Sequence, residues 1–340
     1  MKKSAIFIAV IAVILCTIAA VSIGVIRVPM EAVFFIIKAK ICGTHIPAEW
    51  ATYEIAVWNL RLPRILLCLI TGSILAICGA AFQSVFRNPI CDPYILGISS
   101  GASLGAAAAI ILGLDIFLFG ISACALVAAL TTLFLVLGIA YAGNRKKTET
   151  ILLAGIAINF LTSALITILM VLHQESLQEI VFWTMGSFAS ATWTEIACMF
   201  PIFLVGAFFL FFLAKNLNIM QLGNDTAQTA GVDTKRTTLT VLIIASVLIS
   251  TAVAFCGVIG FVGLIVPHIA RLLFGNNNRT VFAFSIFFGA LFCLIADTLA
   301  RIVASPAELP VGSVTAFAGA PYFIFLLLTN PKKSKHTLST

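Results

Sequence analysis

The sequence predicts an all-α polytopic membrane protein with about ten transmembrane helices, and three observations lead to this fold class. The chain of 340 residues is 61% hydrophobic and only 10% charged, whereas soluble domains carry about 45–50% apolar and about 25% charged residues. Apolar runs long enough to span a bilayer, which takes about 20 residues, recur along the whole chain. These runs are continuous rather than alternating, which argues against a transmembrane β-barrel.

Ten apolar runs are the predicted spans. The first follows Lys2 and Lys3 and resembles a signal peptide. It is longer than a signal core of about 7–15 residues, so we expect it to remain as a span. The eighth is the shortest and contains Pro267, a residue type that interrupts helices. The predicted spans are residues 5–26, 63–86, 94–112, 118–142, 151–172, 196–214, 239–256, 258–274, 281–303 and 311–329.

The distribution of lysine and arginine sets the predicted orientation. Cytoplasmic loops of membrane proteins are enriched in basic residues, and an even number of spans places both termini on the same side. With both termini in the cytoplasm, fourteen of the twenty basic residues lie inside and six outside. We therefore expect a multi-pass protein of the cytoplasmic (inner) membrane. Its net charge of +7 is then a topology signal rather than a sign of nucleic-acid binding.

Two connecting segments are longer than a turn within what is otherwise one predicted transmembrane domain, 1–340. Residues 27–62 form the predicted outer loop, in which "PMEAVFFIIKAK" is typical of a short interfacial helix. Residues 215–238 form the predicted cytoplasmic coupling loop, which is polar and contains Gly223 and Gly231. That pattern favours two short helices broken at glycine, a natural docking surface, although the composition also fits a solvated linker.

The stretch "RNPICDPYILGISSGASLGA" (87–106) interrupts the apolar pattern with helix breakers and small polar residues. Pro89 and Pro93 lack an N–H and crowd the preceding turn, so the backbone there needs protein or water as its partner. Three glycines then recur every fourth residue, on one helix face that permits close helix contact. These are Gly97, Gly101 and Gly105. The pattern predicts an irregular entry and then a tightly packed helix, for which packing and pore lining both remain open.

Four charged residues at or within the spans are candidates for function. Arg61 and Arg64 stand at the outer end of the second span, and Arg301 stands at the outer end of the ninth. Such arginines can be snorkelling anchors, or they can form a basic outer face that pairs with carboxylates of a partner protein. Asp297 lies deep in a span, where an ionisable residue is a functional candidate. Because Arg301 is one turn further on, we predict a structural ion pair between the two.

The sequence has almost no catalytic or metal-binding pattern. A P-loop and the H-E-x-x-H and S-x-x-K motifs are absent. Most of the nine cysteines lie inside apolar runs, where cysteine behaves as a small hydrophobic residue. Neither C-x-x-C nor a Cys/His zinc spacing occurs. We therefore expect a chain that is not an enzyme and holds no metal.

Three long blocks of the sequence and one polar loop carry a family resemblance. The blocks are "LRLPRILLCLITGSILAICGAAFQSVFRNPICDPYILGISSGASLG" (60–105), "GVIGFVGLIVPHIARLLFG" (257–275) and "ADTLARIVASPAELPVGSVTAFAGAPYFIFLL" (296–327), and the loop is "LGNDTAQTAGVD" (222–233). The three blocks resemble the permease family of iron-siderophore, haem and cobalamin ABC importers, the FecCD-type or type II importers, and the loop resembles that family's cytoplasmic coupling segment. The resemblance runs nearly end to end, and the three blocks together are far more specific than any one alone.

The resemblance implies a dimer of permeases, formed with a second copy or with a different permease. It also implies two ATP-binding cassette subunits, which hold ATP and Mg²⁺ so that this chain binds no cofactor itself, and an extracytoplasmic substrate-binding protein. In the family, arginines of the first and last blocks meet glutamates of the binding protein, which implies that role for Arg61, Arg64 and Arg301. Contacts with the ATPase map onto the cytoplasmic loop, at Leu222, Gly223, Asp225, Ala230, Gly231 and Val232.

The cytoplasmic gate of the family lies after the "NP" of the first block and before the fifth span. It maps onto Ile90, Thr148 and Glu149, although a charged Glu149 departs from the small polar residues expected there. A gate needs backbone that is not a rigid continuous helix, which would explain the two prolines nearby. By the same resemblance, the translocation path passes near Asn159 and residues 312–315.

The sequence therefore predicts the permease subunit of an ATP-driven importer, with a siderophore as its first expected cargo and haem or cobalamin as alternatives. An ion-coupled secondary transporter would need a relay of carboxylates or histidines in the membrane, and only Asp297 qualifies. A membrane-embedded enzyme would need catalytic residues clustered at one membrane face, and the sequence offers none. A non-transporting scaffold would leave the outer arginines and the cytoplasmic loop unexplained.

Overall fold

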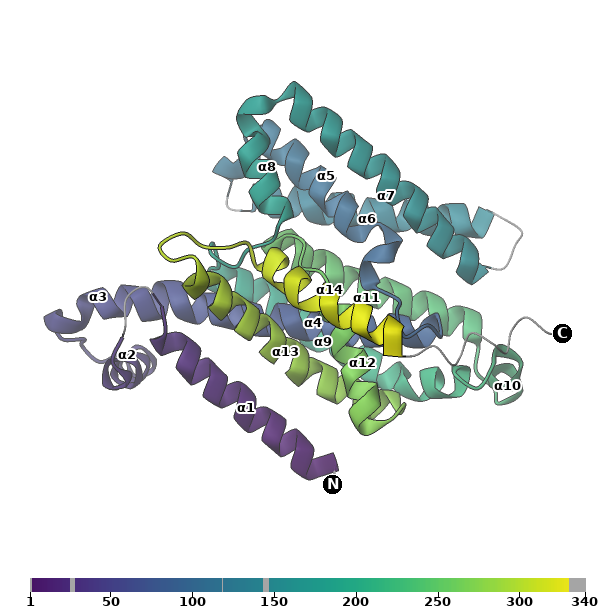
Figure 1. Cartoon of the computed structure of the whole chain (residues 1–340), viewed down its shortest axis with the longest axis horizontal. Coiled ribbons are helices and arrows are strands. Elements are labelled where there is room, and N and C mark those ends of the chain that lie inside the picture. The colour runs from purple at the N-terminus through teal and green to yellow at the C-terminus, as the bar shows by residue number, and fades with distance from the viewer. Residues whose placement is uncertain (1, 25–27, 118, 143–146, 330–340) are drawn as a thin grey trace.

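The computed structural model describes residues 2–24, 28–117, 119–142 and 147–329. Within these ranges every regular element is helical, as predicted. Figure 1 shows an elongated bundle with the α2–α3 region at one end and α10 at the other. We call the two ends of the bundle the arginine end, which holds Arg61, Arg64 and Arg301, and the α10 end.

Each of the ten predicted spans overlaps a different apolar helix, and residues 25, 26 and 118 of these spans lie outside the described residues. Among the described residues, seven helices are long and apolar enough to cross a membrane, and the three shorter apolar helices are α5, α12 and α14. The ten-helix prediction is thereby confirmed. The helices are α1 (Lys2–Ser22), α4 (Leu62–Val85), α5 (Ile98–Ile111), α6 (Gly120–Ala142), α7 (Lys147–Leu172), α9 (Trp193–Met220), α11 (Thr234–Cys256), α12 (Val262–Phe274), α13 (Asn278–Val303) and α14 (Val311–Thr329).

Helix α4 forms the centre of the bundle, where it packs against α9, α11, α12 and α13. Small residues make these contacts possible. A Cβ added at Gly72 would lie 2.2 Å from the carbonyl oxygen of Gly289 in α13, and one at Gly79 would lie 1.8 Å from that of Gly263 in α12. Close backbone approach of this kind gives van der Waals packing, a main attraction between helices in lipid. The small residues of α4 therefore explain why it is the core helix.

Helices α5 to α8 form a second group, which Figure 1 shows beside the helices around α4. A Cβ at Gly101 of α5 would lie 2.1 Å from Thr132 Oγ1 of α6, and one at Gly105 would lie 2.4 Å from the carbonyl oxygen of Cys124. Gly97 has a φ of 78° and forms the N-cap of α5. Of the two interpretations of the recurring glycines, the structure thus supports close helix packing within the chain.

The predicted outer loop, 27–62, is partly wrong. It does contain the expected short helix, α2 (Met30–Cys42). The helix leading into α4, however, already begins at residue 48. It consists of η1 (Ala48–Trp50), α3 (Ala51–Glu54) and the π-helical η2 (Ile55–Arg61). Pro63 suggested a break, but it occupies the first turn of α4, where a missing N–H is tolerated, and the helical path continues across it through the π-helical turns.

The predicted pair of short helices in 215–238 is also wrong, because the structure has one. Helix α9 extends to Met220 and α11 begins at Thr234, which leaves α10 (Asn224–Thr229) between them. Gly223 (φ 130°) and Gly231 (φ 81°) bound it as predicted. A further helix, α8, was not predicted, because its eight residues are too short for an apolar pattern to indicate. The remaining short helices are η3 (Pro93–Leu96), η4 (Leu114–Ile116), η5 (Gln174–Ser176) and α8 (Leu177–Thr184).

Candidate functional site

The arginine end holds a buried cluster of charged side chains around Asp297. Arg61 and Arg64 come from the junction of η2 and α4, and Arg301 comes from the last turn of α13. The three arginines are 8%, 7% and 6% exposed, and Asp297 is fully buried. Residues predicted from separate parts of the sequence are thus brought together, but inside the protein rather than on its outer face.

Asp297 lies between two arginines. Arg64 Nε donates to Asp297 Oδ1 at 2.9 Å, and its Nη2 lies 2.8 Å from the same oxygen. Arg301 Nε lies 3.1 Å from Asp297 Oδ2, close enough for an ion pair although the N–H is not aligned as a hydrogen bond. The predicted pair of Asp297 with Arg301 is therefore present, and Arg64 joins it. Buried charges need this kind of pairing, because an unpaired one is very costly.

Glu308 completes the cluster and was not predicted. Its Oε2 lies 2.8 Å from Arg64 Nη1, and its side chain is 40% exposed. Glu308 follows α13 in the connection to α14, within the "SPAELP" stretch. An acid close to Arg301 in sequence was a weak signal, but nothing local indicates that it reaches an arginine on α4.

The arginines also bind the end of α1. Arg61 Nη1 donates to the carbonyl oxygen of Val21 at 2.6 Å. Arg301 donates to those of Ala20 and Ile23, both at 3.4 Å. The last carbonyl groups of a helix lack partners within the helix, and cations near them are stabilising. Part of the role of these arginines is therefore to anchor α1 on α4 and α13.

A cavity of about 320 Å³ lies against the cluster. Guanidinium groups, one carboxylate and a few apolar side chains line it, so a carboxylate from outside the chain could be recognised there. Its lining residues are Gly24, Ala56, Leu60, Arg61, Arg64, Ala189, Arg301 and Glu308.

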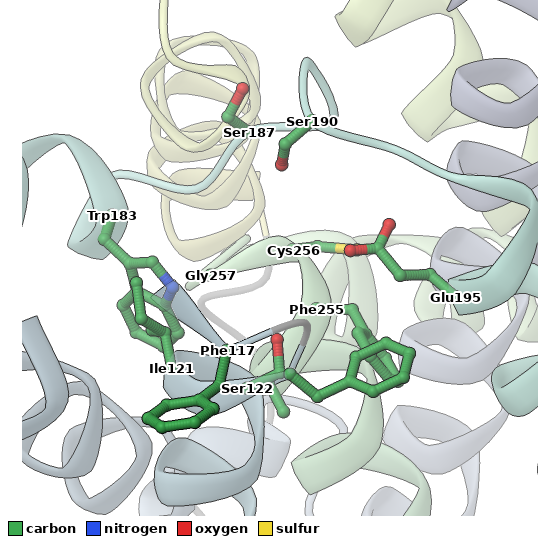
Figure 2. A pocket seen from close by; sticks show the side chains of 13 residues that line it. Phe117, Ile121, Ser122, Trp183, Ser187, Ser190, Glu195, Phe255, Cys256 and Gly257 are labelled. Atoms are coloured by element: carbon green, nitrogen blue, oxygen red, sulfur yellow. The ribbon is translucent and has the colours of Figure 1, made fainter. Parts of the chain in front are cut away.

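A second cavity, of about 210 Å³, lies among α6, α8, α9 and α11. Figure 2 shows the rings of Phe117, Trp183 and Phe255 along one part of it, with the hydroxyl groups of Ser187 and Ser190 elsewhere on its wall. Glu195, which also lines it, is already used as a helix cap: its carboxylate accepts from the N–H of Thr192 at 2.9 Å. The sequence carried no signal for this cavity, because four separate segments contribute to it.

The α10 end presents the predicted coupling residues around one short helix. Leu222 is 73% exposed, and Asp225, Ala230 and Gly231 are also exposed. The segment is anchored by the buried Ala227 and Val232, whose backbones are joined by a hydrogen bond of 2.9 Å. The arrangement places an exposed apolar residue beside a short helix whose base is fixed in the core.

The predicted gate residues lie near the same end. Ile90 is 39% exposed in the turn between α4 and η3. Thr148 and Glu149 belong to the first turn of α7, and the side chain of Thr148 lies outside the described residues. A groove of about 620 Å³ is lined by Glu149 together with Arg87 and residues of α10 and α11.

Next to this turn, Asp92 caps η3 by accepting from the N–H of Tyr94 at 2.8 Å. Burial raises the pKa of the Asp92 carboxyl to about 6, because the charged form is poorly solvated there.

Residues near the predicted translocation path have partners within the chain. Ser100 Oγ donates to Asn159 Oδ1 at 2.6 Å, which ties α7 to α5. Thr315 is fully buried and donates to the carbonyl oxygen of Gly312 at 3.0 Å. Their role in a path stays a prediction.

The helix count and the long apolar helices define a polytopic membrane protein of α-helices. Comparison with known proteins gives the family. The model of the FecCD transport family matches residues 11–329, so the chain belongs to that family and is an ABC importer permease.

Two relatives and one solved structure agree with this assignment. The uncharacterised ABC transporter permease YvrB of Bacillus subtilis (strain 168) is 37% identical over 91% of this chain and 88% of its own length. The cobalamin import permease BtuC of Halobacterium salinarum is 41% identical over 81% of this chain and 74% of its own. An inward-facing structure assigned to a metal-chelate type ABC transporter matches with a TM-score of 0.84 and 30% identity, covering 96% of this chain and 99% of that one.

Proposed function

We propose that this permease carries a metal chelate, in the first instance an iron–siderophore complex, into the cell, driven by ATP hydrolysis on separate subunits. The observation that carries the proposal is the pairing of two features on an ABC importer permease. An arginine-lined cavity lies at one end of the bundle, and a protruding short helix lies at the other. An importer needs both features, because a loaded binding protein docks at one end and the ATPase docks at the other and moves the permease.

The arginine end is the proposed outer face, where a substrate-binding protein docks through carboxylates. The cavity beside Arg61, Arg64 and Arg301 supports this role, because guanidinium groups bind carboxylates with directed, charge-assisted hydrogen bonds. The arginines are already engaged within the chain, so a partner carboxylate would reach only the donor edges that face the cavity. This predicts a contact that orients the binding protein more than it adds affinity.

The α10 end is the proposed cytoplasmic face, where one ATP-binding cassette subunit docks on each permease. This orientation agrees with the predicted cytoplasmic termini. The exposed Leu222 supports this role, and so does the packing of the buried Ala227 and Val232, which hold α10 in place. An element that couples two subunits must move as one body with the protein that carries it.

A second permease, identical or different, is the proposed partner in the membrane. The uncovered faces of α7 and α14 support this, because they carry large apolar side chains such as Phe160 (74% exposed) and Phe317 (84% exposed). A path between two permeases would then be lined by residues of both.

The cargo is proposed from the relatives. The Halobacterium relative is a cobalamin importer and the matched structure is of the metal-chelate type, so both names refer to metal complexes. A siderophore complex is the first choice here, and haem and cobalamin are the alternatives. Asp297 is held by two arginines, which disfavours an ion-coupled transporter that would need it as a free relay group.

The test is co-purification of the tagged chain from its native membrane, followed by reconstitution in proteoliposomes with ATP inside. We expect an ATPase subunit and a binding protein to accompany it. The vesicles should then take up one of three labelled cargoes: a ferric siderophore, haem or cobalamin. Vesicles loaded with a non-hydrolysable ATP analogue are the control. Uptake that ignores ATP but collapses with an ionophore would refute the proposal.

A further inference from the structure

Helix α4 ends in an unusual way. The N–H of Phe86 bonds to the carbonyl oxygen of Phe82 at 2.9 Å, and the N–H of Asn88 bonds to that of Gln83 at 3.1 Å. The second bond is the 6→1 bond of a Schellman-type helix end, in which the residue just before its donor adopts the left-handed conformation. Here that residue is Arg87, with a φ of 49°. Glycine, or sometimes asparagine, usually occupies this position because other side chains are disfavoured there.

The side chain of Arg87 reaches a distant element. Its Nη2 donates to Oδ1 of Asn224, which is the first residue of α10 and follows Gly223. Both residues line the groove at the α10 end. A residue that is poorly suited to its backbone conformation thus makes a specific contact across 137 positions of sequence. An outlier in backbone conformation, joined to such a contact, is the kind of observation from which a functional role can be inferred.

The turn that follows Arg87 is rigid. The side-chain oxygen of Asn88 accepts from the N–H of Ile90 at 3.1 Å, and the backbone carbonyl oxygen of Asn88 accepts from the N–H of Cys91 at 3.1 Å. Cys91 is 2% exposed and therefore fixed in the core, whereas Ile90 is exposed. Because Asn88 is bonded to Ile90, a displacement of α10 that moves Arg87 would be passed to the exposed Ile90, with the buried Cys91 as the fixed end of the turn.

We propose that Arg87 is a positioning residue that ties α10 to the turn 88–91, so that movement of α10 under the ATPase moves Ile90. The inference rests on the proposed function, which makes α10 the ATPase-docking element and Ile90 a gate residue. Arg87 touches neither cargo nor nucleotide in this role. Its contribution is to convert ATP hydrolysis into gate movement.

The test compares variants in the reconstituted complex, with ATP hydrolysis and cargo uptake measured on the same vesicles. Arg87→Gly is the decisive variant, because glycine suits the left-handed backbone and removes only the side chain. We expect this variant to assemble with the ATPase and hydrolyse ATP, while the cargo taken up per ATP falls about tenfold. Asn224→Ala should have the same effect, and the double variant should be no worse than either single one, as expected for one shared contact. Arg87→Lys, which keeps a donor, should restore part of the coupling.

A second measurement does not depend on transport. Amide hydrogen exchange of Asn88, Ile90 and Cys91 in the purified full chain should be faster in Asn224→Ala than in the wild type, because the contact that holds the turn to α10 is gone. The matched control is Asp225→Ala, which changes the adjacent exposed residue of α10 and should leave exchange in this turn unchanged.

The outcomes separate the inference from the function on which it rests. Wild-type vesicles without ATP-driven uptake would refute the proposed function, and the exchange experiment would still decide whether the tie exists. Arg87→Gly with normal uptake per ATP would overturn the inference while leaving the proposed function intact. Loss of ATPase assembly in Arg87→Gly would also overturn it, because Arg87 would then be a docking residue.

Discussion

Helices α4 and α7 are similar in sequence character and opposite in surroundings. Both are long and apolar. In the most apolar stretch of the helix that contains α4, 89% of the residues are buried, whereas in the corresponding stretch of α7 only 22% of the residues are buried. The contacts of α4 involve small residues that let neighbouring backbones approach. Bulky side chains, Phe160 among them, project from the uncovered face of α7.

The difference teaches that apolar length identifies a span but does not identify its neighbours. In lipid there is no hydrophobic gain from bringing two apolar helices together, so packing and polar contacts decide which helices associate. Helix α4 is satisfied within the chain, through backbone contact along its length and ion pairs at its arginine end. The open face of α7 is available to lipid or to another subunit. Four changes test this division.

The largest effect is expected for Gly79→Leu on α4. A Cβ at this position would lie 1.8 Å from the carbonyl oxygen of Gly263, and the clash is with backbone rather than a movable side chain. The substitution should therefore lower the stability of the fold by more than the loss typical of overpacking, which is about 1–3 kcal/mol. We expect no folded protein to accumulate in detergent extracts. Gly138→Leu on α6 is the control, since nothing lies within 4 Å of a Cβ there. A normal yield of folded protein from both variants would contradict the conclusion that α4 is the core helix.

The next effect is expected for Asp297→Asn, at the arginine end of the bundle. The change leaves Arg64 and Arg301 without their shared carboxylate in a buried site, a loss of about 3–5 kcal/mol for comparable pairs. Thermal unfolding in detergent should show a clear fall in the midpoint. The control is Asp233→Asn, whose partner Arg236 is exposed, where we expect a loss of about 0–1 kcal/mol. Equal stability of the two variants would contradict the role assigned to the buried cluster.

The two variants also mark what the sequence could and could not predict. The ten helices follow from local apolar length, and the pairing of Asp297 with Arg301 follows from their spacing of one turn. The contacts of Arg64 with Asp297 and Glu308 join residues 233 and 244 positions apart, so only the packing of α4 against α13 creates them. The same holds for Arg87 and Asn224, which belong to different helix ends.

Local signals also misled at two places. Pro63 indicated a boundary, because proline breaks helices in their interior, yet in the first turn of a helix it is tolerated. The two glycines of the coupling loop indicated two short helices, but the neighbouring long helices extend into the loop from both sides. In both cases the continuation of a helix depended on what it packs against, which no local pattern contains.

A smaller effect is expected for Phe160→Ala on α7. The side chain is 74% exposed within the chain, so its loss should leave the unfolding midpoint of the monomer nearly unchanged. If α7 faces a second permease, the dimer should dissociate about tenfold more readily, in line with the loss of an aromatic contact at an interface. Dilution of the purified complex in detergent, followed by light scattering, measures this.

The matched control for this effect is Phe208→Ala on α9, a residue that is 68% exposed on a different helix. It should affect neither folding nor dimerisation if its face meets lipid. Equal weakening of the dimer in both variants would show that α9 belongs to the dimer interface as well as α7.

The smallest effect is expected for Glu308→Gln, where the satisfied helix α4 meets the exterior. Glu308 is partly exposed, and its pair with Arg64 should contribute only about 0–1 kcal/mol to stability, so folding should change little. Its carboxylate nevertheless occupies a donor edge of Arg64 that a docking protein would need. Removing that charge should strengthen binding of the substrate-binding protein about fivefold, the equivalent of about 1 kcal/mol.

Titration of the binding protein onto the complex in nanodiscs measures this, with Glu49→Gln as the control at another exposed acid near the same end. Weaker binding in Glu308→Gln alone would mean that Glu308 helps to form the docking surface instead of competing for Arg64. The charged groups at the arginine end of α4 would then belong with their partners inside the chain, as the rest of that helix does.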